Sequence, residues 1–222
     1  MKLSIIIPTF NEEDSLPLLV KDLLTWRAPG DEIIVVDGGS TDRTLERTNR
    51  SVDIVVRSEK GRARQMNAGA AVASGEMLWF VHADCRLSQI RRRELSEALA
   101  KGFLWGHFDV TIGGNAKLFR VIESFMNIRS RATRIVTGDM GIFITVDLFN
   151  KIEGFPRMEL MEDIELSKKL CKIKPYVSGQ RIVVSDRRWS SKGIIKTALL
   201  MWLVRLAWFF RVPTNLLAKI YD

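Results

Sequence analysis

Residues that could bind a ligand, most of them acidic or polar, follow three predicted strands, at the points where those strands end. They are Pro8, Thr9, Asn11 and Glu12, then Asp37 and Gly38, and then His82 and Asp84. Carboxylates accept hydrogen bonds from ring N–H and hydroxyl groups, and they bind hard divalent cations. If the strands share one parallel sheet, the three sets meet at its carboxyl edge, where such sheets bind ligands. A structural explanation competes at each place, because Asn11 and Asp37 also suit a helix cap and a turn.

The elements that would position these side chains alternate between strand and helix. Aliphatic runs predict buried strands at 3–7, 32–36, 53–57 and 77–81. Helical spacing of apolar residues predicts a helix at 16–24, with a short polar helix at 42–50 and an alanine-rich helix at 62–73. This alternation predicts an α/β fold with a mostly parallel central sheet that is flanked by helices.

Length and charge limit the possible architectures and partners. A chain of 222 residues is long enough for one sizeable core. The net charge of +8 comes from the second half, because residues 101–222 hold 20 Lys and Arg against 11 Asp and Glu. The cations are not interleaved with aromatics as in a stacking groove, so we expect no nucleic acid partner. Phosphate-bearing small molecules or an anionic membrane face explain the basicity better.

Five motifs in a fixed order resemble the family 2 glycosyltransferases. They are residues 5–12 (IIIPTFNE), 35–42 (VVDGGSTD), 61–69 (GRARQMNAG), His82-Ala83-Asp84 and Glu162-Asp163. The resemblance covers roughly residues 3–190 and implies the GT-A fold of the nucleotide-diphospho-sugar transferases. It implies a transferase domain at 1–192, with 193–222 as a C-terminal apolar helical extension that packs on the domain, a partner subunit or a membrane surface.

The same resemblance implies a site for a nucleotide-diphosphate sugar, with UDP as the expected nucleotide. The donor-binding residues would be Pro8, Thr9, Asn11, Glu12, Asp37, Gly38, Arg62, Arg64, Asn67 and Arg188. Arginine can bind a diphosphate with two parallel hydrogen bonds, although Arg62 and Arg64 also suit a solvated helix face. Asp84 and His82 would hold Mn²⁺ or Mg²⁺. His82 replaces the first acid of the family's usual Asp-x-Asp pair, and a structural histidine remains an alternative.

Inverting transfer needs a base for the acceptor proton. The resemblance assigns that role to Asp163, with Glu162 as second choice, although both acids also suit the first turn of a helix. Trp189 and Asp139 would lie on the sugar or acceptor side, and Asp139 also suits a turn. The sugar and the acceptor are open, and the acceptor is either a hydroxyl or a lipid phosphate.

The last thirty residues predict an apolar C-terminal helix. Residues 198–204 and 206–210 are all apolar, but Arg205 and Arg211 argue against a transmembrane span. A core helix, a subunit interface such as a homodimer and shallow contact with a membrane surface remain open.

Other function classes fit the sequence less well. The first strand is not followed by the Gly-x-Gly-x-x-Gly turn of a dinucleotide-binding oxidoreductase. A nucleotidylyltransferase would show a glycine-rich loop with a lysine near the N-terminus, and this sequence has no such loop there. Residues 185–189 (SDRRW) resemble a late basic-aromatic motif of the family, with Ser185 in place of its usual glutamine. The serious alternative is a non-catalytic nucleotide-sugar-binding or scaffold protein, because His82 and Ser185 depart from the family's motifs. The two cysteines lack zinc-site spacing and no secretory leader is predicted, which indicates a cytoplasmic protein, with peripheral contact at the inner membrane face open.

Overall fold

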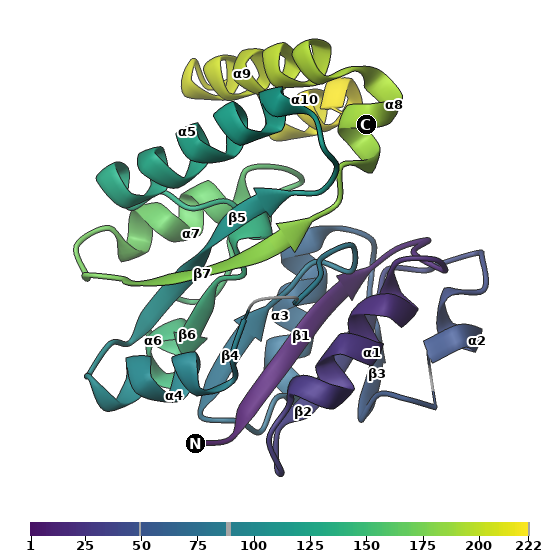
Figure 1. The fold of residues 1–222 in the computed structure, drawn as a ribbon, viewed down its shortest axis with the longest axis vertical. Helices are drawn as coiled ribbons and strands as arrows, with labels where there is room; N and C mark the ends of the chain where they lie inside the picture. Colours follow the sequence, from purple (N-terminus) through teal and green to yellow (C-terminus); the bar gives the residue numbers. More distant parts are fainter. Residues whose placement is uncertain (49, 88–89, 222) are drawn as a thin grey trace.

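A seven-stranded sheet forms the centre of the computed structural model, which describes residues 1–48, 50–87 and 90–221 (Figure 1). The strands are β1 (Leu3–Thr9), β2 (Glu32–Asp37), β3 (Ile54–Arg57), β4 (Met77–Phe80), β5 (Trp105–Ile112), β6 (Phe143–Thr145) and β7 (Tyr176–Val184). In the order β3-β2-β1-β4-β6-β5-β7, neighbours pair in parallel except where β6 meets β4 and β5. The predicted mostly parallel sheet is confirmed.

Helices cover both faces of this sheet, with α1 and α2 on one face and α3 on the other (Figure 1). The helices are α1 (Leu16–Trp26), α2 (Thr44–Thr48), α3 (Arg62–Val72), α4 (Arg93–Ala100), α5 (Lys117–Thr133), α6 (Val146–Lys151), α7 (Glu162–Leu170), α8 (Arg187–Lys192), α9 (Ile194–Phe209) and α10 (Thr214–Tyr221), with a 3₁₀ turn η1 (Gly138–Met140). The elements predicted before residue 85 are present with nearly the same ends. Residue 49 of the predicted helix 42–50 lies outside the described residues.

Burial on both faces explains the continuous aliphatic sequence of the central strands. Every residue of β1, β2 and β4 is buried, as expected for parallel strands that helices cover on both sides. Trp79 of β4 anchors this core, since its ring lies 4.8 Å from that of Trp26 and 5.6 Å from that of Phe108. The core therefore fixes the end of β4, from which His82 and Asp84 project.

Helix α5 completes the hydrogen bonding of β5. β6 pairs with the first two residues of β5. Further along the strand, the Val110 N–H donates to Oδ1 of Asn127 at 2.9 Å, and the Ile112 N–H donates to Oε2 of Glu123 at 3.0 Å. Both acceptors are buried side chains of α5. The inner face of this helix is therefore partly polar, because it satisfies backbone groups of the sheet.

The apolar C-terminal segment forms two helices, where its composition predicts one. Arg211 adopts a left-handed conformation (φ 62°), and Pro213 cannot continue the hydrogen bonding of α9. Val204 of α9 and Leu217 of α10 are buried in a small cluster with Leu160, which precedes α7. In the described part of the chain, no helix is long and apolar enough to cross a membrane.

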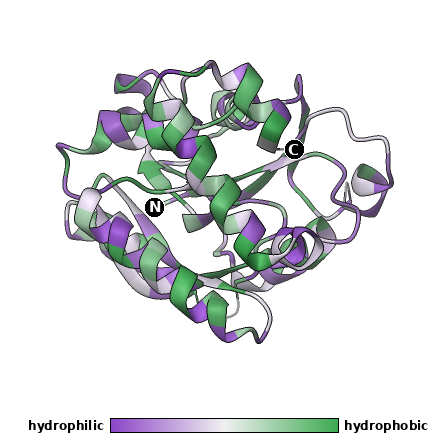
Figure 2. Cartoon of the chain, turned by 90° about the horizontal axis from the view of Figure 1, so that it is seen from above, coloured by the Kyte–Doolittle hydropathy of each residue, from purple (hydrophilic) through white to green (hydrophobic). Residues whose placement is uncertain are grey.

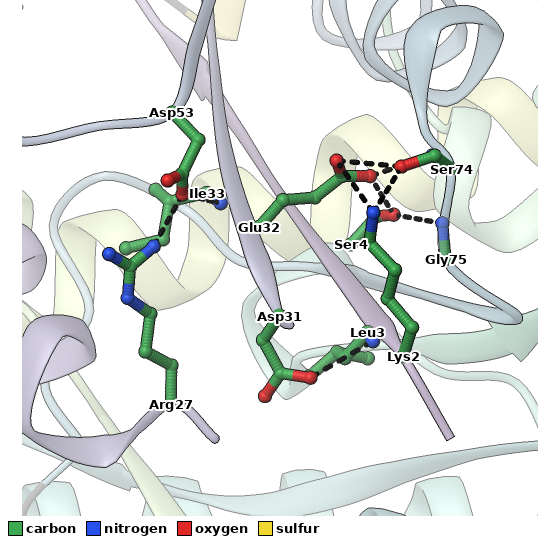
Figure 3. A network of polar contacts seen from close by, with 10 residues as sticks. All are labelled: Lys2, Leu3, Ser4, Arg27, Asp31, Glu32, Ile33, Asp53, Ser74 and Gly75. Carbon is green, nitrogen blue, oxygen red and sulfur yellow. Dashed lines mark hydrogen bonds and ion pairs between the residues drawn. The ribbon is translucent and has the colours of Figure 1, made fainter. Parts of the chain in front are cut away.

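Acids at the amino edge of the sheet hold the starts of the strands together (Figure 3). Asp31 accepts the Leu3 N–H at 3.0 Å. Glu32 accepts the Ser4 hydroxyl at 2.6 Å and the Ser74 hydroxyl at 2.8 Å. Since ligands of parallel sheets bind at the opposite edge, these acids stabilise the fold and lie away from the predicted site.

Removal of Asp31 should destabilise the protein at neutral pH. Burial alone would raise the pKa of Asp31, but hydrogen bonds from Arg92 and from backbone N–H groups hold it below 3.8. A folded-state pKa below the unfolded value means that this stabilisation is present above about pH 4 and is lost at lower pH. We expect Asp31→Ala to lower the free energy of unfolding at pH 7 by about 3–5 kcal/mol, because Arg92 loses its buried partner.

Urea denaturation at pH 7 and pH 3 measures this effect. The difference between Asp31→Ala and the unchanged protein should shrink at pH 3, because the stabilisation by the ionised carboxylate falls once the pH is below the unfolded-state pKa. Asp14→Ala is the matched control, because the Asp14 side chain is 86% exposed and its ion pair with Arg47 contributes little. An equal loss at both pH values would contradict a stabilising role for the ionised carboxylate.

Candidate active site

The carboxyl ends of β1, β4 and β7 border one cavity of about 850 Å³. Its wall also includes the first turn of α3, η1, the start of α7, and residues of α8, α9 and α10. The predicted site residues that line it are Pro8, Thr9, Glu12, Arg62, His82, Asp84, Asp139, Asp163, Arg188 and Trp189. The cavity therefore brings together side chains from both halves of the chain at the edge of the sheet where the sequence predicts a site.

Six predicted site residues do not line the cavity: Asn11, Asp37, Gly38, Arg64, Asn67 and Glu162. Asp37 is 2% exposed and accepts the N–H groups of Gly39 and Ser40 at 3.1–3.2 Å. Asn11 has a positive φ and accepts the Thr41 N–H at 2.8 Å. Asp37 thus stabilises the turn after β2, and Asn11 holds the loop after β1 against that turn.

Arg64 and Asn67 also have structural partners. Arg64 pairs with Glu159 at 3.0 Å. The amide of Asn67 exchanges two hydrogen bonds with the backbone of Phe155, at 2.8 and 3.0 Å. Gly38 lies against the side chain of Gln65, 3.1 Å from where a Cβ would stand. Asn67 thus ties α3 to the loop after α6, which forms part of the support of the cavity.

Two potential metal ligands follow β4. Nε2 of His82 is buried and has no hydrogen-bond partner among the described residues. Burial and the charge of Arg62 lower the pKa of His82 to about 4, so its imidazole is neutral at pH 7. Burial raises the pKa of Asp84, and the neighbouring carboxylate of Glu12 raises it further, while His82 and Arg187 oppose the shift. A cation would relieve both the orphaned nitrogen and the buried carboxylate.

These ligands fit a cation that is shared with a bound anion. Within the described ranges, no group of three or more His, Cys, Asp and Glu side chains could hold a metal ion. Divalent cations such as Mg²⁺ commonly bind one or two carboxylates and complete their shell with phosphate oxygens and water. Asp84 and His82 can therefore supply two ligands, with the remainder coming from a diphosphate.

Gly138 brings the end of β4 next to the start of α7. A Cβ at this position would lie 2.7 Å from Nε2 of His82 and 3.9 Å from Oδ2 of Asp163. The Gly138 N–H donates to the same Oδ2 at 2.8 Å, and Oδ1 of Asp163 accepts the Ile164 N–H at 2.7 Å. The Asp163 carboxylate is thus held in the cavity wall beside the His82 imidazole.

Glu162 lies behind the cavity wall and pairs with Arg62. The Arg62 Nε lies 2.7 Å from Oε1 of Glu162, whose side chain is 2% exposed. Burial raises the pKa of Glu162 to about 7, against the lowering effect of Arg62, and the charge of Asp163 raises it further. Glu162 therefore orients an arginine of the cavity, whereas Asp163 faces the cavity itself.

Two arginines, Arg129 and Arg205, carry positive charge near the Asp139 carboxyl group. Arg205 of α9 lines the cavity. Nε and Nη2 of Arg129 are buried without a hydrogen-bond partner in the described part of the chain. Burial and the charge of Arg205 lower the pKa of Arg129 to about 10, while Asp139 and Asp163 raise it. Burial raises the pKa of Asp139, and the Asp163 charge adds to this shift.

The residues after β7 close the cavity over β1. Arg187 pairs with Glu12 at 2.7 Å between Nη2 and Oε1. Arg188 and Trp189 line the cavity, and the Trp189 ring packs edge-on against Phe119 with 6.2 Å between centroids. The late basic-aromatic motif is thus positioned by a contact with α5, and it presents positive charge to the cavity.

Sequence reasoning missed several residues that line the cavity. Gln65 is buried, and its Nε2 donates to the carbonyls of Thr9 and Val36 at 2.8 Å each, which joins the ends of β1 and β2. The position of Gln65 within the motif at residues 61–69 was the feature of the sequence that could have identified it as a site residue. Arg205 was considered only as a charge that interrupts an apolar run. A lone charge in such a helix indicates a polar site on one side, because a buried charge needs a partner.

The chain is similar to known proteins in sequence and in structure. The family model described as Glycosyl transferase family 2 matches residues 4–153. Dolichol-phosphate mannosyltransferase of Pyrococcus furiosus is 29% identical over 178 residues, which cover 75% of this chain and 49% of that protein. Undecaprenyl-phosphate 4-deoxy-4-formamido-L-arabinose transferase of Pectobacterium carotovorum is 31% identical over 111 residues, covering 45% and 34%. The chain spans about half or less of the length of these curated relatives.

Solved structures resemble the fold at lower sequence identity. Mannosyltransferase PcManGT from Pyrobaculum calidifontis, in complex with GDP-Man and Mn²⁺, has a TM-score of 0.66 at 19% identity, covering 99% of this chain and 69% of that chain. TarS 1-349 of S. aureus, in complex with UDP, has a TM-score of 0.63 at 21% identity, covering 83% and 60%.

Proposed function

The chain belongs to glycosyl transferase family 2 and has the GT-A fold, and from this premise we propose that it transfers a sugar from a nucleoside-diphosphate sugar to an acceptor with inversion. UDP is the proposed nucleotide and a hydroxyl the proposed acceptor group. The observation that carries the proposal is one cavity that holds Asp84, the neutral His82, Asp163 and several arginines. The cavity volume of about 850 Å³ suits a ligand of this size.

The donor side of the cavity is proposed to be the wall formed by β1 and α3. Pro8, Thr9 and Glu12 follow β1 there, and Arg62 stands at the start of α3. Arg62 and Arg188 carry the positive charge that a diphosphate needs. UDP and GDP-Man are bound by the structural relatives. Glu12 would accept hydrogen bonds from ribose hydroxyl groups.

A divalent cation, Mn²⁺ or Mg²⁺, is proposed to bind Asp84 and His82 together with the diphosphate. The buried carboxylate of Asp84 supports this assignment, as does Nε2 of His82, which has no hydrogen-bond partner in the described part of the chain. When bound, such an ion neutralises negative charge on the departing diphosphate. The protein's part is to keep the His82 imidazole neutral and to fix Asp84 at the end of β4.

Asp163 is proposed as the general base. An acceptor oxygen forms a bond to the anomeric carbon, while the bond from that carbon to the diphosphate oxygen breaks. The electron pair of the broken bond goes to the diphosphate, and the acceptor proton goes to Asp163. The two backbone N–H groups that bind Asp163 hold its carboxylate in the cavity wall, with lone pairs left to receive the proton. Arg62 and Arg188 face the charge that develops on the diphosphate.

A lipid phosphate is the second candidate acceptor. Two buried nitrogens of Arg129 have no hydrogen-bond partner among the described residues, and with the cavity position of Arg205 they favour an anionic group near these arginines. Trp189 would line the sugar or acceptor side. The curated relatives include transferases whose names carry dolichol phosphate and undecaprenyl phosphate. A phosphate acceptor is already ionised at neutral pH, so transfer of the sugar to it would depend little on a general base.

Release of nucleotide from a panel of nucleoside-diphosphate sugars tests the proposed function. We expect release from a UDP-sugar that requires Mn²⁺ or Mg²⁺ and is suppressed by a chelator. Affinity for the donor without release of nucleotide, under every metal and acceptor condition, would instead indicate a non-catalytic nucleotide-sugar-binding or scaffold protein.

We assign the reaction to the cytoplasm, in line with the free thiols of Cys85 and Cys171.

A further inference from the structure

Helix α5 exposes its apolar stripe. Leu118, Val121, Phe125 and Ile128 recur at helical spacing and are 39–67% exposed. The opposite face of the helix points inward and includes the buried polar side chains of Glu123 and Asn127. A surface helix of a globular protein usually has the reverse arrangement, with apolar residues inside. The exposed stripe therefore calls for a partner that the described residues do not supply.

Helix α9 extends this apolar surface. Ile195, Leu199, Trp202, Leu203, Leu206 and Phe209 are 54–75% exposed, while Thr197 and Val204 are its buried residues. The rings of Phe125 and Trp202 lie 5.6 Å apart and join the two helices. α5 and α9 lie side by side at the top of the molecule in Figure 1, and Figure 2 shows hydrophobic residues along helices at this end. We call these outward side chains of the two helices the α5/α9 surface.

Exposed cations lie before and after the apolar residues of α9. Residues 187–221 contain seven Lys and Arg residues and no Asp or Glu. Lys192 and Lys196 are exposed at the start of α9, and Arg211 and Lys219 are exposed beyond its end. The nearby acids are paired, since Glu123 lies 3.3 Å from Arg120, and Glu165 lies 3.0 Å from Lys168.

We propose that the α5/α9 surface docks on an anionic lipid bilayer, with the apolar side chains inserted at the headgroup level and the cations on lipid phosphates. Exposed apolar and aromatic side chains within a basic rim are typical of helices that lie in a membrane interface. A second copy of the chain fits less well. In a two-fold dimer this surface would meet itself, and its cations would face cations, while the described residues of α9 and α10 include no acid to pair with them.

Docking would place the cavity next to the bilayer. Met201 and Arg205 of α9 and Ala218 of α10 line the cavity, so α9 separates it from the proposed membrane contact by one helix. An acceptor anchored in lipid could then reach Arg205 without leaving the membrane. The inference does not rest on sugar transfer, because binding to lipid is measured without donor or turnover.

Flotation of the full chain with lipid vesicles tests the proposal. We expect binding to vesicles of phosphatidylcholine with about 30% phosphatidylglycerol, little binding to phosphatidylcholine alone, and release as NaCl rises from about 0.1 to about 0.5 M. Leu203→Glu and Ile128→Glu should each weaken binding to anionic vesicles at least about tenfold, because each puts a carboxylate into the contact. Leu24→Glu is the matched control, since Leu24 is 43% exposed and lies on α1.

The variants are compared after their thermal melts are shown to match that of the unchanged chain. Failure of the full chain to float with anionic vesicles would overturn the proposal. Equal binding by Leu203→Glu, Ile128→Glu and Leu24→Glu would also overturn it. A dimer in size-exclusion chromatography that Leu203→Glu converts to a monomer would identify a second copy as the occupant instead.

Discussion

Replacement of Asp163 with asparagine is expected to reduce sugar transfer to a hydroxyl acceptor by about 10²–10⁴-fold, the usual contribution of a positioned general base. Donor affinity should change little, because Asp163 is proposed to act on the acceptor proton and not on the nucleotide. The asparagine amide keeps an oxygen that can accept one of the two backbone N–H groups now bound by the carboxylate. Single-turnover rates with saturating donor, measured beside donor affinity, separate the two effects.

Glu162→Gln is the comparison for this experiment. Glu162 is buried behind the wall and pairs with Arg62, so its loss should raise the KM for the donor more than it lowers kcat. A larger fall in kcat for Glu162→Gln than for Asp163→Asn would reverse the assignment of the base. Transfer by Asp163→Asn that persists within about tenfold would favour a phosphate acceptor, which needs little help from a base.

The first half of the fold was predictable because its strands are buried on both faces. β1, β2 and β4 are covered by helices, so their sequences are continuous aliphatic runs that stand apart from the helices between them. β5 does not show this pattern, because it carries His107 and Asp109, both buried. Asp109 is paired with Arg131 at 2.7 Å. A polar residue that is paired within a buried strand gives no strand signal in the sequence.

The geometry of the loops after the strands decides which predicted site residues face the cavity and which do not. His82 and Asp84 project into the cavity, while Asp37 binds the N–H groups of its own turn. The position at a strand end is visible in the sequence, but the direction of the side chain depends on the dihedral angles of the turn. Arg205 was missed for a related reason, since the apolar residues around almost all of α9 do not show which side faces the domain, and the lone charge was the only indication.

Replacement of Asp84 with asparagine should weaken nucleotide binding in Mn²⁺ by about 10²-fold or more, since a metal held between carboxylate and diphosphate contributes several kcal/mol. Binding without a divalent ion should change much less, and transfer should be lost. Isothermal titration with the nucleoside diphosphate, with and without Mn²⁺, measures the difference. Asp147→Asn on the exposed side of α6 is the control. Equal affinity of Asp84→Asn and the unchanged protein in Mn²⁺ would remove Asp84 from the metal site.

Stability should respond to Asp84→Asn in the opposite way to Asp31→Ala. Burial raises the pKa of Asp84, so the fold favours its neutral form, and that stabilisation is lost as pH rises through the folded-state pKa. Asparagine resembles the neutral form, so without metal at pH 8 the variant should be at least as stable as the unchanged protein. Asp31 is ionised and paired, and its loss destabilises the fold. A melting temperature several degrees lower for Asp84→Asn would indicate that this carboxylate, like Asp31, serves the fold.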